Sequence, residues 1–308
     1  MKGKLKMLTW IIVGFVLLSA GILITIPYAI MLSLDIPVRF SKTWTAEEFG
    51  LQADHLFVKT EDGLNISTFE VAVENPKAVI ICLSGICNPS ATIYFGHARL
   101  FTEHGYATII LDMRAHGESE GSKICLGFKE WLDVKAVVEH IKVKPLYDNV
   151  SIIVFGLSMG GATAINAFGE LPEINGLISL SAYSSWEDTF YDNMSVKVPK
   201  LLALIDKPFV SLVTFLKFGA VSCVIKPKIA ITKTGNRPVL LMHSKEDSQV
   251  PFASFKRLLR QSPSHIETFI RDGDAHFITD HFGNPEKDEA YADAIISFLN
   301  KLFGNYQR

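Results

Sequence analysis

The sequence predicts an α/β protein with a mostly parallel central sheet flanked by helices, a helical cap and an N-terminal transmembrane helix. Three observations predict this. Apolar strand-like runs alternate with helical patterns from residue 55 onward, a long stretch at about 184–235 interrupts the alternation, and residues 7–34 carry no charge. Strands that alternate with helices favour a parallel sheet covered by helices on both faces.

The composition limits the class of protein. The chain has 308 residues, of which 48% are hydrophobic and 20% are charged, and its mean hydropathy is +0.25. Disordered chains are rich in charge and poor in aromatic residues, so that class is excluded. The 30 basic and 32 acidic residues nearly balance, so we expect no nucleic-acid partner. The positive mean hydropathy requires at least one unusually apolar segment, because soluble proteins carry about 25% charged residues.

The apolar segment lies at the start of the chain. Residues 7–34 are uncharged, and a helix needs about 20 apolar residues to cross the hydrocarbon core of a bilayer. A buried core helix would be shorter and would carry a polar face. A cleaved signal peptide is the main alternative, but its apolar region is normally about 7–15 residues and ends at a small-x-small site. No convincing site of that kind follows, so we predict an uncleaved anchor.

The charges beside this segment predict its orientation. Lys2, Lys4 and Lys6 precede it, whereas Arg39 and Lys42 follow it. Lys and Arg are retained on the cytoplasmic side, so we expect a cytoplasmic N-terminus and an extracytoplasmic domain. The predicted organisation is an anchor at 1–34, a stalk at 35–54 and one domain at 55–308 with the cap inserted at about 184–235.

The domain begins with a hairpin and continues as alternating strands and helices. Residues 61–63, Glu-Asp-Gly, are a turn signal between strand patterns at 55–60 and 64–73, which predicts antiparallel strands at one edge. The later strand patterns are continuous apolar runs, as expected of strands buried on both faces. These strands are predicted at 78–85, 106–113, 150–155, 175–183, 238–245 and 265–272, and helices at 93–104, at 128–142, after residue 158 and at about 286–303.

The predicted cap separates two sheet strands by more residues than a simple crossover needs. It contains a weakly charged run at 201–225. That run is predicted to be a greasy lid over the site or a surface against the bilayer, or only the cap's own core. A second membrane span is a further alternative. Asp206, Lys207, Pro208 and Lys217 interrupt the run, and a span would divide the domain across the bilayer.

A nucleophile motif follows the strand predicted at 150–155. Residues 156–160, Gly-Leu-Ser-Met-Gly, fit G-x-S-x-G and are followed by an alanine-rich helical pattern. On a sharp strand-to-helix turn, small neighbours let the backbone approach closely, and the helix N-terminus favours developing negative charge. The alternative is a glycine-rich turn with an inert serine. The strand-turn-helix context favours Ser158 as the nucleophile.

A serine hydroxyl needs a base, and the base needs a carboxylate that orients it. His276 follows the strand at 265–272, and Asp247 follows the strand at 238–245. Both loops lie after the nucleophile in the order Ser, Asp, His, at the sheet edge where α/β proteins bind ligands. We therefore predict Ser158, Asp247 and His276 as the catalytic residues.

Other residues compete for two of these roles. His281 is the alternative base, Glu246 is the alternative acid, and His243 is expected to end a strand and pack there. The remaining histidines, apart from the one at 116 discussed below, have no supporting pattern: His55, His97, His104, His140 and His265.

Together these motifs resemble the α/β-hydrolase superfamily over roughly residues 55–303. Residues 112–121 are similar to its D-x-R-G-x-G-x-S-x-G segment, of which D-x-R-x-H-G-x-S is a common close form. The Asp-x-x-Val-Pro at 247–251 and the Gly-x-x-His-Phe at 273–277 are similar to its acid and base loops. The resemblance implies a serine hydrolase that needs no metal or organic cofactor. It places His116 in a structural loop, so His116 is not predicted as the base.

The resemblance also implies an oxyanion hole of two backbone N–H groups. One follows the nucleophile, at Met159. The other is expected in the loop after the strand at 78–85, where relatives often have His-Gly-x and this chain has Ser84, Gly85 and Ile86. We predict Ile86 as this donor, and the missing histidine is a departure from the family pattern. Nearby Cys87 is expected to be a packed residue, with a modifiable thiol or a disulfide to Cys125 as alternatives.

The predicted reaction is hydrolysis of a carboxylic ester through an acyl-enzyme, with an apolar or lipid-like substrate at a membrane. The pair Gly160 and Gly161 extends the motif to G-x-S-x-G-G, which is shared with prolyl-oligopeptidase-like enzymes. Peptidase or amidase activity and thioesterase activity are therefore alternatives on the same fold. A protein of another class, a catalytically inactive membrane-tethered binding module, also remains open, because fold alone does not decide function.

Overall fold

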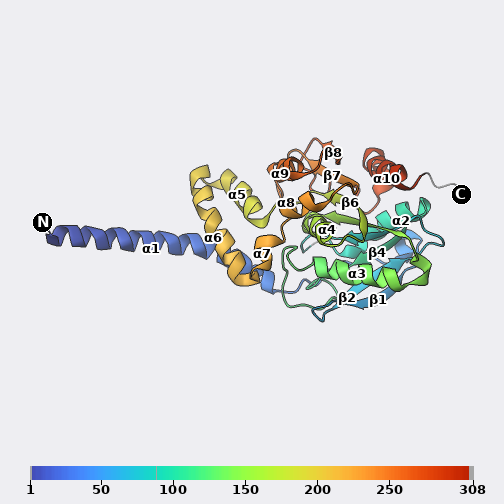
Figure 1. Ribbon diagram of the computed structural model, residues 1–308, viewed down its shortest axis with the longest axis horizontal. Coiled ribbons are helices and arrows are strands. Elements are labelled where there is room, and N and C mark those ends of the chain that lie inside the picture. The colour runs from blue at the N-terminus through green and yellow to red at the C-terminus, as the bar shows by residue number, and fades with distance from the viewer. Residues whose placement is uncertain (1, 88, 305–308) are drawn as a thin grey trace.

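An eight-stranded sheet forms the centre of the computed structural model, which describes residues 2–87 and 89–304 (Figure 1). The strand order is β1-β2-β4-β3-β5-β6-β7-β8. Strand β2 runs antiparallel to both of its neighbours and all other pairs are parallel. The strands are β1 Asp54–Lys59, β2 Asn65–Val71, β3 Ala78–Leu83, β4 Ala107–Leu111, β5 Ser151–Leu157, β6 Ile174–Leu180, β7 Val239–Ser244 and β8 Glu267–Arg271.

The helices connect these strands and build the cap. Every strand pattern predicted from the sequence corresponds to a strand, and the antiparallel edge is confirmed. The helices are α1 Lys2–Leu32, α2 Phe95–Glu103, α3 Trp131–Val143, α4 Met159–Glu170, α5 Trp186–Lys197, α6 Lys200–Phe218, α7 Val221–Val224, α8 Pro227–Ala230, α9 Ala253–Gln261 and α10 Glu289–Phe303.

Helix α9 was not predicted. It is only nine residues long, and three of them are buried: Ser254, Phe255 and Leu258. Phe255, Leu258 and Leu259 are its only large apolar residues, so the sequence shows no apolar run there, and isolated helices of this length are only marginally stable. Its helicity therefore depends on packing against the domain.

The sheet divides the apolar core into two layers. Residues of α3, α4 and α9 form a cluster on one face, and residues of α2 and α10 form a second cluster on the other face. Strand β3, at the centre, is buried along its whole length. A sheet covered on both faces needs strands that are apolar on both sides, which is why the central strands are continuous apolar runs.

Helix α1 projects from the domain on the side of cap helices α5 and α6 (Figure 1). In the described part of the chain, we find no helix with the length and apolarity needed to cross a membrane. The predicted anchor falls partly outside that description, because the structure does not describe the side chains of residues 2, 4, 5, 8, 15–17, 19, 20 and 22. The transmembrane segment therefore stays a prediction.

The segment predicted as a stalk lies against the domain. Val38 donates its N–H to the Ala115 carbonyl at 2.7 Å and accepts the N–H of Gly117 at 3.0 Å. The preceding residue Leu34 is buried in the main core, and its carbonyl accepts the N–H of Ile124 at 2.8 Å. Residues 35–54 are thus fixed to the surface.

Helices α5 to α8 lie between β6 and β7 along the chain, in the segment where the sequence predicts the cap. Helix α6 keeps Pro208 within it and ends at Phe218, followed by Gly219 with a positive φ of 75°. Its Asp206 is buried, whereas several of its leucines are exposed. The weakly charged run is therefore only in part the cap's own core.

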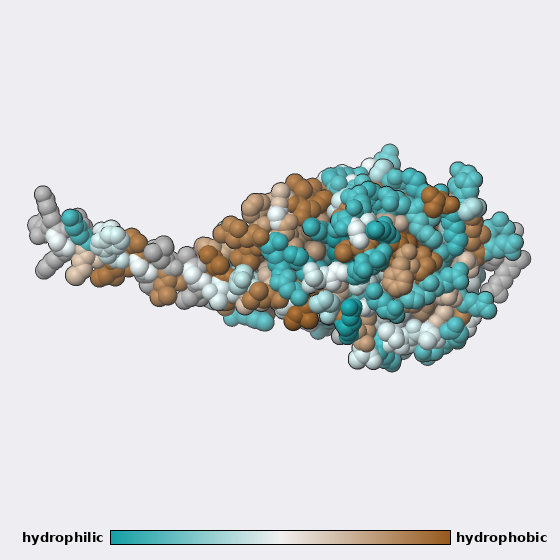
Figure 2. Space-filling view, turned by 90° about the horizontal axis from the view of Figure 1, so that it is seen from below, coloured by the Kyte–Doolittle hydropathy of each residue, from teal (hydrophilic) through white to brown (hydrophobic). Residues whose placement is uncertain are grey.

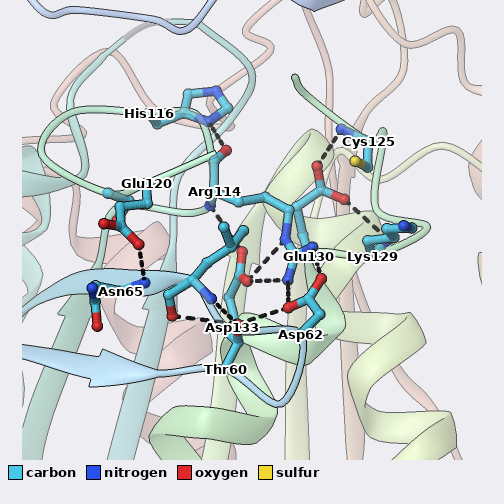
Figure 3. Close-up of polar contacts among 12 residues, drawn as sticks. Thr60, Asp62, Asn65, Arg114, His116, Glu120, Cys125, Lys129, Glu130 and Asp133 are labelled. Atoms are coloured by element: carbon cyan, nitrogen blue, oxygen red, sulfur yellow. Dashed lines mark hydrogen bonds and ion pairs between the residues drawn. The ribbon is translucent and has the colours of Figure 1, made fainter. Parts of the chain in front are cut away.

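A buried ion-pair network ties the hairpin to α3 (Figure 3). The Arg114 guanidinium donates to Asp133 at 2.7 Å and 2.9 Å and to Asp62 at 2.7 Å and 3.1 Å. Arg114 and Asp133 are almost fully buried. Next to them, Glu130 accepts the Cys125 N–H at 2.6 Å. Arg114 of the 112–121 motif thus has a structural role.

His97 gives the fold a pH dependence. Burial within an aromatic cluster lowers the pKa of His97 to about 3. In the unfolded chain the His97 imidazole takes up a proton near pH 6.5, whereas in the folded protein it stays neutral down to about pH 3. The free energy of unfolding is therefore unaffected by His97 above pH 6.5 and decreases as the pH falls from 6.5 toward 3. The expected contribution to the slope is about 1.4 kcal/mol per pH unit.

Unfolding by denaturant in detergent between pH 7 and pH 4 measures this slope. The His97→Phe variant should show a shallower pH dependence than the wild type, although the variant also removes the bond to the Tyr291 hydroxyl. His265 is exposed, so His265→Phe is the matched control. Equal slopes for the wild type and His97→Phe would contradict the assignment.

Candidate active site

Ser158 lies on a strained turn between β5 and α4. Its φ of 57° and ψ of −117° are unusual for a residue with a side chain. Its N–H donates to the Leu180 carbonyl at 2.8 Å, and its carbonyl accepts the Ala162 N–H at 2.9 Å. The strand and the helix thus both hold the turn, and the helix N-terminus lies directly after the serine.

Close backbone packing explains the glycines on both sides of Ser158. A Cβ on Gly156 would lie 2.2 Å from the Gly160 carbonyl oxygen, and a Cβ on Gly160 would lie 2.3 Å from the carbonyl oxygens of Leu83 and Ser84. Both distances are below van der Waals contact. The motif spacing predicted from the sequence therefore has a direct steric cause.

His276 and Asp247 meet at the same edge of the sheet. His276 Nδ1 lies 2.8 Å from Asp247 Oδ2, and Asp247 Oδ1 accepts the N–H groups of Gln249 and Val250 at 2.9 Å each. Burial alone would raise the pKa of Asp247, but the bond from His276 and the backbone donors lower it below its usual value. An ionised Asp247 fixes the proton of His276 on Nδ1, which leaves Nε2 as the acceptor of a base.

The structure forms no hydrogen bond between Ser158 Oγ and His276 Nε2, as far as its described residues extend. Catalytic hydrogen bonds are often long before substrate binds and shorten in the reacting complex. The geometry brings Asp247 and His276 together after β7 and β8, and it presents Ser158 after β5, which β6 separates from β7.

Side chains that the sequence did not point to hold the His276 loop. Ser181 Oγ donates to the His276 carbonyl at 2.6 Å, and Ser244 Oγ donates to the Ala275 carbonyl at 2.6 Å. Asp274 accepts from the backbone N–H of Ser248 at 2.6 Å, which joins the base loop to the acid loop. The sequence contains only a weak indication of these two serines. Ser181 directly follows β6 and Ser244 ends β7, close to the strand ends that carry the predicted site residues.

His281 and Glu246 form hydrogen bonds elsewhere, whereas His243 Nε2 lies 3.7 Å from Asp247 Oδ2. His281 is exposed, and its N–H donates to Thr279 Oγ1. Glu246 accepts the N–H of Gly273 rather than contacting His276. His243 lies in β7, is buried, and bonds to the Val250 carbonyl at 2.8 Å. Burial lowers the pKa of His243, which keeps it neutral beside the site.

A cavity of about 290 Å³ opens beside Ser158. Met159 and Ile86, the two predicted oxyanion-hole donors, line it with Ser158. Their roles stay predictions. The rest of its wall comes from α1, the loop before α3, the segment after β6, helix α5 and the loop that contains Asp247: Ile30, Leu126, Tyr183, Trp186, Thr189, Phe190, Asn193, Met194, Lys197, Gln249 and Val250.

The part of the cap that lines the cavity at Ser158 is not the apolar run that the sequence suggested as a lid. Helix α5 supplies the cap residues of the cavity wall, whereas the apolar run at 201–225 lies in α6 and α7 and supplies none of them. Nearby, Cys87 and Cys125 are both free, so the disulfide considered from the sequence is not formed.

Comparison with known proteins identifies the fold. The hydrolase family described as "Serine aminopeptidase, S33" matches residues 74–215. The esterase Pf2001 of Pyrococcus furiosus superposes with a TM-score of 0.67 at 23% identity, covering 88% of this chain and 98% of that chain. The protein is a hydrolase with the α/β-hydrolase fold.

Two further proteins are similar to this hydrolase, one in structure and one in sequence. The α/β hydrolase GrgF from Penicillium sp. sh18 superposes with a TM-score of 0.64 at 15% identity, covering 82% of this chain and 99% of that chain. An uncharacterised protein of Bacillus subtilis, YqkD, is 25% identical over 317 aligned residues, covering 93% of this chain and 97% of that protein. The likeness thus extends over nearly all of the domain.

Replacing Asp247 by asparagine should lower turnover of this hydrolase about 10⁴-fold, because an amide favours the wrong tautomer of His276. The kcat of the purified variant on a p-nitrophenyl ester measures the effect. Glu246→Gln is the matched control and should keep most of the activity, since Glu246 bonds only to backbone. A larger loss in Glu246→Gln than in Asp247→Asn would assign the acid role to Glu246.

Proposed function

We propose that the protein is a serine hydrolase that cleaves a carboxylic ester with an apolar acyl group, and that Ser158, His276 and Asp247 form its catalytic triad. The observation that carries the proposal is the 2.8 Å bond between His276 and Asp247 at the sheet edge where Ser158 occupies its strained turn. The esterase-like fold supports the ester as the substrate class.

The reaction follows from these three side chains. Ser158 Oγ attacks the ester carbonyl carbon while His276 Nε2 takes the hydroxyl proton, and Asp247 stabilises the imidazolium. The backbone N–H groups of Met159 and Ile86 would stabilise the oxyanion. His276 then protonates the leaving alcohol, and a water molecule hydrolyses the acyl-enzyme by the same steps in reverse. This route requires no metal or organic cofactor.

The cavity wall supports an apolar acyl group. Trp186, Phe190 and Met194 of the cap face the same cavity as Ser158. Apolar walls with few polar groups bind apolar ligand parts and leave orientation to the reacting centre.

We also propose that residues 7–34 anchor the enzyme in a membrane, with the N-terminus in the cytoplasm and the domain outside. The uncharged segment and the lysines before it support this. The alternative is secretion after cleavage of the segment. Burial of Met31 in the main core supports retention, because cleavage after the apolar run would remove a core residue.

Labelling with a fluorophosphonate probe tests the triad. The wild-type protein should form a covalent adduct at Ser158, and Ser158→Ala should form none. Absence of labelling in the wild type, with hydrolysis of no ester, would instead favour an inactive membrane-tethered binding module.

The family description favours one second candidate, a peptidase or amidase, and the same acyl-enzyme chemistry also serves thioesters. A substrate panel separates these. p-Nitrophenyl esters of increasing chain length should be hydrolysed faster than aminoacyl amides or acyl thioesters. Faster hydrolysis of amides would assign a peptidase.

A further inference from the structure

The cavity at Ser158 contains a residue of the N-terminal helix. Ile30, in the last turns of α1, lines this cavity together with Ser158 and with Trp186 of the cap. The side chain is 38% exposed, so it is part of a wall rather than of the core. The helix predicted to enter the bilayer thus ends in the wall of the candidate active site.

A second apolar cavity lies beside the same end of α1, next to Met31 and Leu32. It has about 480 Å³ and lies between α1 and α6. Its two charged residues, Asp35 and Lys217, form an ion pair at 2.8 Å and so neutralise each other. The remaining wall is Ile24, Tyr28, Met31, Leu32, Val213 and Leu216.

The end of α1 is held in place against the cap. Met31 and Leu34 are buried in the main core. Lys217 of α6 donates to the Met31 carbonyl, one of the last carbonyls of the helix, and also pairs with Asp35. Burial of Met31 and Leu34 fixes the end of α1, and the bonds of Lys217 fix α6 against it. The groove between α1 and α6 is therefore part of the packed fold.

Helix α6 also presents an apolar face to the outside. Leu201 is 68% exposed and Leu216 is 73% exposed, and Leu202, Leu204, Leu212 and Phe215 are exposed as well. Figure 2 shows apolar surface gathered at the end of the domain from which α1 projects. Exposed Lys197 and Lys200 adjoin this face, where cationic side chains suit phosphate head groups.

We propose that α1 and α6 form a lateral entrance through which the acyl chain of a bilayer lipid reaches Ser158. This rests on the proposed esterase function and assigns its substrate class as long-chain carboxylic esters held in a membrane. The apolar face of α6 contacts the acyl region of the bilayer, and the neutralised groove and Ile30 contact the chain. Continuity of this face with the uncharged run of α1 favours lipid as the occupant over a second protein copy.

Substitutions that fill the entrance test this in the full-length protein. Hydrolysis of p-nitrophenyl acetate and p-nitrophenyl palmitate is measured in phosphatidylcholine-detergent micelles. Ile30→Trp and Leu216→Trp should each lower the palmitate-to-acetate ratio of kcat/KM at least tenfold. Ile26→Trp is the matched control, because Ile26 is exposed on α1 one turn away and lines neither cavity. It should leave the ratio unchanged.

Fluorophosphonate labelling of each variant separates the two proposals. If the wild type is not labelled, the esterase function fails. If all variants are labelled and the ratio is unchanged in Ile30→Trp and Leu216→Trp, or changes equally in Ile26→Trp, the lateral entrance is overturned and the esterase function stands. A dimer in detergent that Leu216→Trp dissociates without a change in the ratio would assign the face to a second copy and overturn the lipid entrance.

Discussion

Ester hydrolysis by the Ser158→Ala variant should be lower than that of the wild type by about 10⁴-fold to 10⁶-fold. Alanine removes the hydroxyl of the proposed nucleophile but keeps the Cβ, so we expect the strained backbone at φ 57° to be unchanged. The kcat for a p-nitrophenyl ester measures the loss. Circular dichroism and the unfolding midpoint should match those of the wild type.

His276→Ala should lose a similar amount, and the double variant should be little worse than either, because nucleophile and base act as one unit. His281→Ala is the matched control, since His281 is exposed and does not contact Asp247. If His281→Ala lost more activity than His276→Ala, the base would be His281. Additive losses in the double variant would contradict the shared role.

The Asp133→Ala variant should unfold with a free energy about 3–5 kcal/mol below that of the wild type. Arg114 donates to Asp133 through its guanidinium and also through its backbone N–H at 2.8 Å, and both side chains are excluded from water. Removing Asp133 leaves a buried positive charge with Asp62 as its remaining hydrogen-bonded carboxylate. Denaturant unfolding in detergent at pH 7 measures the change.

An exposed ion pair provides the comparison. Asp272 pairs with Lys245 at 2.5 Å, but its side chain is 83% exposed. Asp272→Ala should therefore leave the unfolding midpoint nearly unchanged, since water and salt screen such pairs. Equal losses in both variants would show that burial of Arg114 does not determine the strength of the network.

The sequence was sufficient for most of the sheet because burial on both faces requires unbroken apolar runs. Strand β3, at the centre, is one such run, and the turn at 61–63 marked the antiparallel edge. Helix α9 was missed because Phe255, Leu258 and Leu259 are its only large apolar residues, so no apolar run marks a helix that packing stabilises. The predicted stalk begins with a segment that is held against the domain, because Val38 forms hydrogen bonds with Ala115 and Gly117.

The candidate site was predicted where its residues belong to local motifs. Gly156 and Gly160 flank Ser158 because their backbones approach neighbouring carbonyls, and such steric demands leave a fixed spacing in the sequence. Ser181 and Ser244 were not predicted, because each acts by bonding to a carbonyl in a loop distant along the chain. Hydroxyl groups that position another segment have no spacing of their own.

The sequence by itself determined the strand order along the chain, the strained serine turn and the order Ser, Asp, His, because each follows from local sterics or from the identity of a few residues. Only the tertiary structure decided that α5 rather than α6 lines the cavity at Ser158 and that Ile30 of α1 forms part of its wall. Such contacts depend on how distant helices pack. The physical reason is that packing is set by the combined shape of many apolar side chains, and no single segment encodes that shape.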